Sequence, residues 1–158
     1  MIEFLTAKPV LIGLHLGFAI LGIDAFLWVL GKFRDSSSSV KSRMVPALIG
    51  TGAFLLSWLV GGYYYVVYYG SLVKPVIKAG IAPWAHAIAM ETKEHIFLFI
   101  LPLAITATFI AMLGNKELDR LKIRGYALLL CGVIAGLGFL IGAMGFVISA
   151  AARWGVIN

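Results

Sequence analysis

Histidine and carboxylate side chains that share a helix face can bind a metal ion or a haem, and this sequence offers one such set. His15 lies in the first long apolar run, and His95 lies near the start of the third, just after Glu91 and Glu94. Residues three and four apart share one face of a helix, so Glu91, Glu94 and His95 are expected to line the same side. Ionisable groups within an apolar helix are costly unless they are solvated, paired or bound. They therefore indicate either a functional site or an exposed helix end, where Lys93 and lipid headgroups keep the carboxylates solvated.

Bis-histidine ligation of one haem b is the first chemistry that His15 and His95 suggest. Haem iron accepts two axial histidines, and cofactor sites in helical bundles are built from side chains on facing helices. Phe18 and Gly22 share the face of His15 and could pack along a porphyrin. We therefore predict a membrane-bound electron-transfer subunit that holds one haem b between His15 and His95 near the outer membrane face. His86 is expected to be solvated at the mouth of its helix.

A non-haem metal site is a second interpretation of the same residues. Imidazole and carboxylate groups suit transition metal ions such as zinc, iron, manganese or copper, and His15, His95, Glu91 and Glu94 could supply four ligands. The Glu-x-x-His pattern of di-iron bundles is absent, because Thr92 stands three residues before His95. The metal interpretation therefore depends on the four side chains meeting in space.

A third interpretation has no cofactor and makes the chain an accessory or scaffold subunit of a larger membrane complex. Asp24 is the one acid deep in an apolar run. Helix geometry places it about 180° from His15, on the face that carries Gly13 and Gly17. Asp24 could pair with a tyrosine or a basic residue, relay protons or fix contacts with other membrane subunits or with a second copy of the chain.

Four apolar segments must position these residues. The chain has 158 residues, of which 61% are hydrophobic and 13% charged, whereas about a quarter of the residues in soluble domains are charged. A helix needs about 20 apolar residues to cross a bilayer. Four runs reach that length, at about 9–30, 45–69, 83–113 and 126–150. We predict an all-α membrane protein, a single four-transmembrane-helix bundle over residues 1–158.

Basic residues gather in the two loops that follow the first and third runs. They are eight of the thirteen lysines and arginines: Lys32, Arg34, Lys41, Arg43, Lys116, Arg120, Lys122 and Arg124. The positive-inside rule places both loops in the cytoplasm, so the N-terminus, the C-terminus and the connection from Gly70 to Pro83 are expected outside the cytoplasm, across a plasma (inner) membrane. The net charge of +6 therefore reflects the lipid bilayer as partner and implies no nucleic acid.

Tyrosine and glycine patterns predict how the helices meet their surroundings. Five tyrosines between residues 63 and 69 form an aromatic belt at one membrane edge. Adjacent positions are about 100° apart on a helix, so at least one of these rings should face the bundle. In the fourth run, Gly132 with Gly136 and Gly138 with Gly142 have the spacing that permits close helix packing.

The arrangement is similar in outline to four-helix membrane cytochromes b, which bind haem between histidines. The resemblance covers the number of helices and the two histidines, and no diagnostic motif of that family accompanies it. The usual second haem would need four histidines, whereas this chain has three. The resemblance therefore implies at most one bis-histidine haem.

Overall fold

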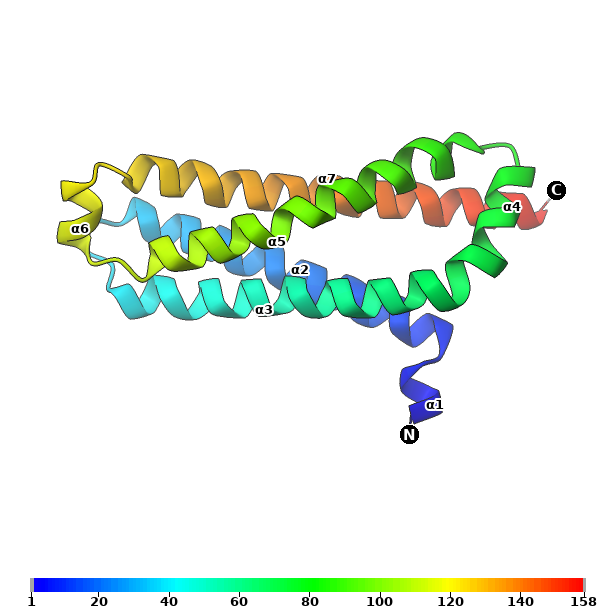
Figure 1. Ribbon diagram of the computed structural model, residues 1–158, viewed down its shortest axis with the longest axis horizontal. Helices are drawn as coiled ribbons and strands as arrows, with labels where there is room; N and C mark the ends of the chain where they lie inside the picture. Colours follow the sequence, from blue (N-terminus) through cyan, green and yellow to red (C-terminus); the bar gives the residue numbers. More distant parts are fainter. Residues whose placement is uncertain (1, 158) are drawn as a thin grey trace.

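The computed structural model describes residues 2–157, with side chains for residues 3–154, and these residues form helices and no strand. Four helical segments are long and apolar enough to cross a membrane: Lys8–Arg34, Val40–Ala79, Ala85–Ala111 and Arg124–Trp154. They lie alongside one another in an elongated bundle (Figure 1). The prediction of an all-α protein with four membrane-spanning helices is confirmed at this level.

The helices follow one another with short connections. A short α1 (Ile2–Leu5) precedes α2 (Lys8–Arg34), and α3 (Val40–Tyr64) continues without a break into the π-helical η1 (Tyr65–Val73) and α4 (Lys74–Ala79). The third span begins as the π-helical η2 (Ala85–Met90) and continues as α5 (Glu91–Ala111). The short α6 (Asn115–Arg120) then leads to α7 (Arg124–Ile157). In the bundle, α2 packs against α3 and α7, and α5 packs against the same two helices from the other side.

The second span is longer than the sequence predicted. We expected it to end near Tyr69 and to be followed by a connection from Gly70 to Pro83, but the chain stays helical to Ala79. Pro75 does not end the helix because it lies in the first turn of α4, where its missing N–H costs little. The wider turns of η1 redirect the chain, so that α4 crosses the end of the bundle (Figure 1).

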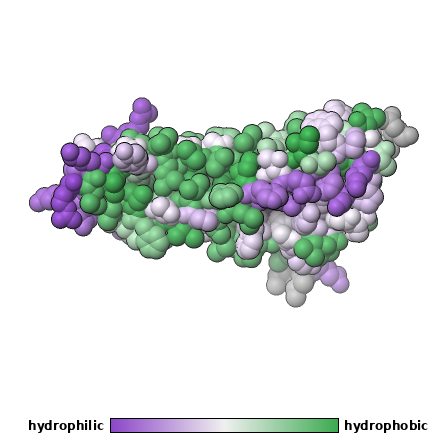
Figure 2. All heavy atoms as spheres, turned by 45° about the horizontal axis from the view of Figure 1, so that its top comes forward, coloured by the Kyte–Doolittle hydropathy of each residue, from purple (hydrophilic) through white to green (hydrophobic). Residues whose placement is uncertain are grey.

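The two ends of the bundle differ in character. Both basic loops and α6 lie at one end, here called the α6 end, and α4 and both chain termini lie toward the other, the α4 end (Figure 1). Figure 2 shows a broad apolar belt between hydrophilic residues at the α6 end and a hydrophilic stripe over the α4 half of the same face. The apolar belt is the surface expected to contact lipid.

Glycines allow close packing at the centre of the bundle, and of the predicted packing pairs in α7 it is Gly138 that leaves no room for a Cβ. Phe26 and Phe54 stack with their ring centroids 5.9 Å apart, and a Cβ at Gly22 would lie 2.7 Å from Phe54. In α7, a Cβ at Gly138 would lie 2.6 Å from the side chain of Ile23. Two other glycines of the predicted packing pairs, Gly136 and Gly142, are instead exposed with open space beside them.

Arg43 is not a loop charge but a fully buried residue that joins the loops at the α6 end. Its guanidinium donates to the carbonyl of Ser38 at 2.9 Å, to the Asn115 side-chain oxygen at 2.8 Å and to the carbonyl of Leu113 at 2.8 Å. Its plane also lies over the ring of Phe33, 5.5 Å from the centroid. Arg43 thus fixes the loop after α2 to the loop before α6.

Candidate functional site

His15 lies between α2 and α3, where the backbone of Ser57 fixes its ring. Its Nδ1 is 2.9 Å from the Ser57 carbonyl oxygen and 3.0 Å from the Ser57 hydroxyl, which donates to the His15 carbonyl at 3.0 Å. A carbonyl oxygen only accepts, so Nδ1 carries the proton and Nε2 keeps a free lone pair. A Cβ at Gly61 would lie 2.6 Å from Nδ1, so only glycine at this position leaves room for the ring.

The side chains of Lys93 and Glu94, near the start of α5, point into the half of the bundle that contains His15. The Lys93 ammonium lies 3.6 Å from the place of a Cβ at Gly145 in α7 and is close enough to His15 to interact electrostatically. Glu94 interacts with Tyr65 of η1, and its Oε1 is buried without a hydrogen-bond partner. Lys93 therefore places a charged group beside Gly145 of α7, inside the bundle.

A buried pair, Tyr69 and His86, connects η1 with η2. The Tyr69 hydroxyl lies 3.0 Å from His86 Nδ1, the Tyr69 ring stacks on Tyr65 at 5.2 Å, and His86 Nε2 lies 3.9 Å from a Glu91 oxygen. Our expectation that His86 is solvated is wrong: only 6% of it is exposed, because η1 and α4 fold over it.

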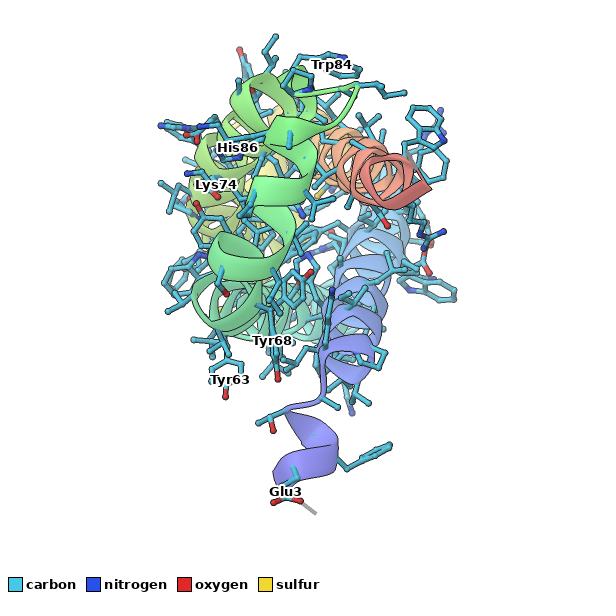
Figure 3. The ribbon with its side chains drawn as sticks, turned by 90° about the vertical axis from the view of Figure 1, so that its right-hand side faces the viewer. Glu3, Tyr63, Tyr68, Lys74, Trp84 and His86 are labelled. Carbon is cyan, nitrogen blue, oxygen red and sulfur yellow. The ribbon has the colours of Figure 1, made fainter. Side chains whose placement is uncertain are left out.

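The tyrosine belt divides between the interior and the surface. Tyr69 is 2% exposed, which confirms that at least one ring of the belt faces the bundle, whereas Tyr63 is exposed and points away from it (Figure 3). Tyr68 lies between these extremes and donates to the carbonyl of Thr6 at 2.9 Å. This bond ties the chain that leads to α4 to the segment before α2.

The predicted ligand set is divided between the inside and the outside of the bundle. His95 is exposed, and its Nδ1 lies 2.6 Å from the carbonyl of Glu91 in its own helix. Glu91 is exposed as well, whereas Glu94 faces inward and His15 is bound to α3. Glu91 and His95 share a face as predicted, but that face points outward. Within the part of the chain that the structure describes, no group of three or more His, Cys, Asp and Glu residues could hold a metal ion.

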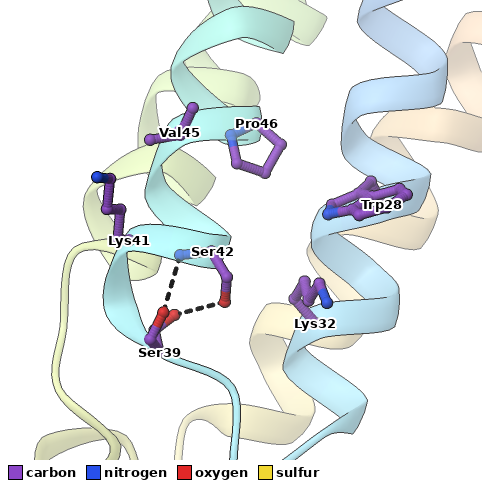
Figure 4. A pocket seen from close by; sticks show the side chains of 7 residues that line it. All are labelled: Trp28, Lys32, Ser39, Lys41, Ser42, Val45 and Pro46. Atoms are coloured by element: carbon purple, nitrogen blue, oxygen red, sulfur yellow. Dashed lines mark hydrogen bonds between the residues drawn. The ribbon is translucent and has the colours of Figure 1, made fainter.

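Asp24 lies on the opposite side of α2, exposed in a groove between α2 and α3. One hollow of about 330 Å³ is lined by residues of both helices: Leu21, Asp24, Ala25, Trp28, Val45, Pro46 and Ile49. An adjoining hollow of about 440 Å³ extends to the α6 end (Figure 4) and is lined by Trp28, Lys32, Ser39, Lys41, Ser42, Val45 and Pro46. The two hollows share three residues, so we treat them as one surface, the α2/α3 groove.

The α6 end of the α2/α3 groove is basic and well ordered by local hydrogen bonds. The Lys32 ammonium lies 5.3 Å from the centroid of the Trp28 ring. Ser39 caps α3 by accepting from the backbone N–H of Ser42 at 3.2 Å, and the Ser42 hydroxyl donates back to the Ser39 carbonyl at 2.8 Å (Figure 4). The groove therefore carries positive charge at one end and a single acid further along α2.

Comparison of the chain with family models, curated proteins and solved structures finds no match. Two regions therefore bear on its function: the α2/α3 groove and the polar cluster of the α4 half, which consists of His15, Tyr69, His86, Lys93 and Glu94.

Proposed function

We propose that this protein is a subunit of a larger membrane complex and that its α2 surface binds another subunit. The observation that carries the proposal is the exposure of Asp24 within a membrane-spanning helix. Asp24 stands ten residues before Arg34, the last residue of α2, so at 1.5 Å per residue it lies about 15 Å from the α6 end of the helix. That position is within an apolar layer about 30 Å thick.

A carboxylate facing lipid at this depth is unfavourable. Charged residues at the centre of a membrane helix cost about 2.5–3.5 kcal/mol or more and are paired or directed to water when they occur. Two ion pairs are present among the described residues, His86 with Glu91 and Arg124 with Asp119, and neither involves Asp24. Another subunit that covers this surface can supply the counter-charge, and this favours assembly over an isolated chain.

The basic loops give the proposed subunit its orientation. Even with Arg43 buried, three basic residues of the first loop and four of the second remain at the α6 end. The positive-inside rule then places this end in the cytoplasm and the polar cluster with His15 toward the other side. The α2/α3 groove accordingly opens near the cytoplasmic surface.

The test is the mass of the particle that contains this chain after extraction in a mild detergent. Native mass spectrometry should find the wild-type chain together with another protein, and Asp24→Asn should release it as a free chain. Glu91→Gln is the matched control, because it also neutralises an exposed acid on a spanning helix but leaves the α2 surface unchanged. A wild-type chain that is free in native membranes, or a complex that Asp24→Asn leaves intact, contradicts the proposal.

An electron-transfer role with one haem b is the second candidate, and the tautomers of two histidines favour it. The rings of His15 and His95 each place Nδ1 on a backbone carbonyl, which leaves Nε2 free; histidines that ligate metals are commonly held in this way. The positions fit less well, because a haem bound by both rings requires α5 to turn His95 inward. Absorption spectra of the oxidised and dithionite-reduced protein test this candidate, and His15→Ala and His95→Ala should each abolish the spectrum of low-spin haem.

A further inference from the structure

The surface around Asp24 also restricts what kind of subunit can bind there, an inference that rests on the proposed function. We propose that the partner is a transmembrane helix of a different protein, packed along α2 with a basic side chain opposite Asp24. Four features support this assignment: a glycine stripe on α2, the shape of the α2/α3 groove, its distribution of charge, and the lack of a suitable cation on a second copy.

A stripe of glycines runs along α2 in line with Asp24. Gly13, Gly17 and Gly31 lie within about 20° of Asp24 around the helix axis. All three are exposed, and a Cβ at any of them would meet nothing within 4 Å. Glycines let another helix backbone approach closely. Residues 17, 24 and 31 are seven apart, the repeat that keeps two helices in contact over several turns.

The α2/α3 groove lies beside this stripe and can receive the partner's side chains. Its walls are apolar over most of their length, with Leu21 and Trp28 on one side and Val45 and Ile49 on the other. Asp24 is the one acid that lines it. A helix seated on the glycine stripe can thus direct apolar side chains into the groove while a neighbouring position reaches the carboxylate.

The charges along the groove define the charges of the partner. Asp24 needs a lysine or arginine at its own depth, because a desolvated carboxylate is stabilised by an opposite charge. Lys32 and Lys41 line the groove at the α6 end. Lys32 is eight residues beyond Asp24, which is about 12 Å along the helix. The complementary helix therefore carries an acid about two turns from its basic residue, toward the cytoplasmic side of the membrane.

A second copy of this chain does not provide that basic residue. A symmetric dimer through α2 would bring Asp24 opposite Asp24, since a two-fold interface pairs the same surface with itself. Three basic side chains lie three or more residues inside the ends of the described spans. Arg43 is buried and donates from both terminal nitrogens to the loops at the α6 end, Lys74 belongs to α4 at the opposite end of the bundle, and Lys93 is turned toward Gly145. Lipid headgroups carry their charges at the membrane surface and do not reach this depth. A transmembrane helix of another protein therefore remains as the source of the basic residue opposite Asp24.

The inference can be tested with the full-length protein in vesicles and a synthetic helix. The probe is a leucine- and alanine-rich peptide of about 20 apolar residues, with one lysine at its centre and one glutamate eight residues toward one end. The matched control peptide has leucine in place of the lysine. The protein is labelled with a fluorescent donor at Ser36→Cys in the exposed loop, since the native Cys131 is buried, and binding is followed by energy transfer to an acceptor on the peptide.

We expect the lysine peptide to bind at least about tenfold more tightly than the control, which corresponds to about 1.4 kcal/mol. Asp24→Asn should abolish the difference, and Glu91→Gln should preserve it. Gly17→Leu should block binding of the lysine peptide, whereas Gly62→Leu, at an exposed glycine of α3 with equally open space, should not. Equal binding of the two peptides overturns the inference. So does an efficient disulfide between two copies through Leu21→Cys, which would make the partner a second copy.

These outcomes are distinguishable from a failure of the proposed function. If native mass spectrometry finds an Asp24-dependent complex but the lysine peptide does not bind, the protein is a complex subunit and its partner has a different chemistry. If no Asp24-dependent complex exists, both proposals fail together.

Discussion

His15 of α2 and Gly61 of α3 fit one another: the imidazole fills the space that any side chain at position 61 would occupy. The distance from His15 Nδ1 to the place of a Gly61 Cβ is 2.6 Å. One turn earlier in α3, Ser57 holds the same ring through its carbonyl and hydroxyl oxygens. A polar side chain is thus accommodated at a helix contact by one hydrogen-bonding residue and one glycine.

Gly61→Ala should therefore destabilise the protein by about 1–3 kcal/mol, because the new methyl group displaces the ring and disturbs its bond to Ser57. Thermal unfolding in detergent measures the change. Gly62→Ala is the control, since position 62 is exposed and has open space. Adding His15→Ala to Gly61→Ala should recover part of the loss, because neighbouring sites that share a contact are not additive. Equal stability of Gly61→Ala and wild type contradicts the predicted clash.

The fourth span offers a comparison between two glycines two residues apart. Gly138→Leu should prevent α2 and α7 from packing, because even a Cβ at Gly138 would lie 2.6 Å from Ile23. Gly136→Leu should leave the isolated chain folded, because its side chain would enter open space on the exposed face. The yield of monodisperse protein in size-exclusion chromatography distinguishes the two. A well-behaved Gly138→Leu variant would show that the contact with Ile23 adjusts easily.

The number and approximate positions of the spans could be predicted because the length of an apolar run is a property of the sequence alone. The direction in which each helix face points could not. In a soluble protein the polar face of a helix marks the side that faces solvent. In a bilayer the outer side of a helix faces lipid and is apolar as well. Because α5 is apolar on all sides apart from its first turns, its sequence does not show which side faces the bundle. The sequence shows that Glu91 and His95 share a face, but not that Lys93 and Glu94 are the pair turned inward.

The same limit applies to the glycines and to His86. Regular spacing identifies glycine pairs in α7 but does not show which glycine of a pair contacts another helix. In the structure, Gly138 lies against Ile23 of α2, whereas Gly136 and Gly142 have open space beside them. His86 is buried because the wide turns of η1 fold α4 over it, and such turns leave no clear signal in composition. Asp24 was recognisable as an unusual acid in an apolar run, but its exposure required the arrangement of α2 and α3.

Arg43 should be among the most sensitive positions outside the polar cluster. Arg43→Ala removes the donors that hold the carbonyls of Ser38 and Leu113 and the Asn115 side chain. The Ser38 carbonyl keeps a bond from the Asn115 amide and the Asn115 oxygen keeps one from Arg124, whereas the Leu113 carbonyl loses its bond from Arg43. A buried group left without a partner costs about 1–3 kcal/mol. We expect a large drop in the unfolding temperature, which can be followed by circular dichroism in detergent. Arg120→Ala, at an exposed position of α6, is the control and should change little. Similar behaviour of the two variants would exclude a structural role for the buried guanidinium.

The orientation of the chain can be decided by cysteine labelling in intact cells, because the two ends of the bundle carry accessible serines. Ser37 lies in the basic loop after α2 and Ser71 lies in η1, and both are exposed. The basic loops predict that Ser37→Cys is protected from an impermeant thiol reagent and that Ser71→Cys reacts. Both cysteines should react once the membrane is permeabilised, and the buried Cys131 should remain unlabelled in either case. The reverse pattern would place the polar cluster with His15 on the cytoplasmic side and would open the α2/α3 groove, with Lys32 and Lys41, toward the outside. The partner's acid would then have to lie near the outer membrane surface, so this experiment also fixes the direction in which the partner helix must be designed.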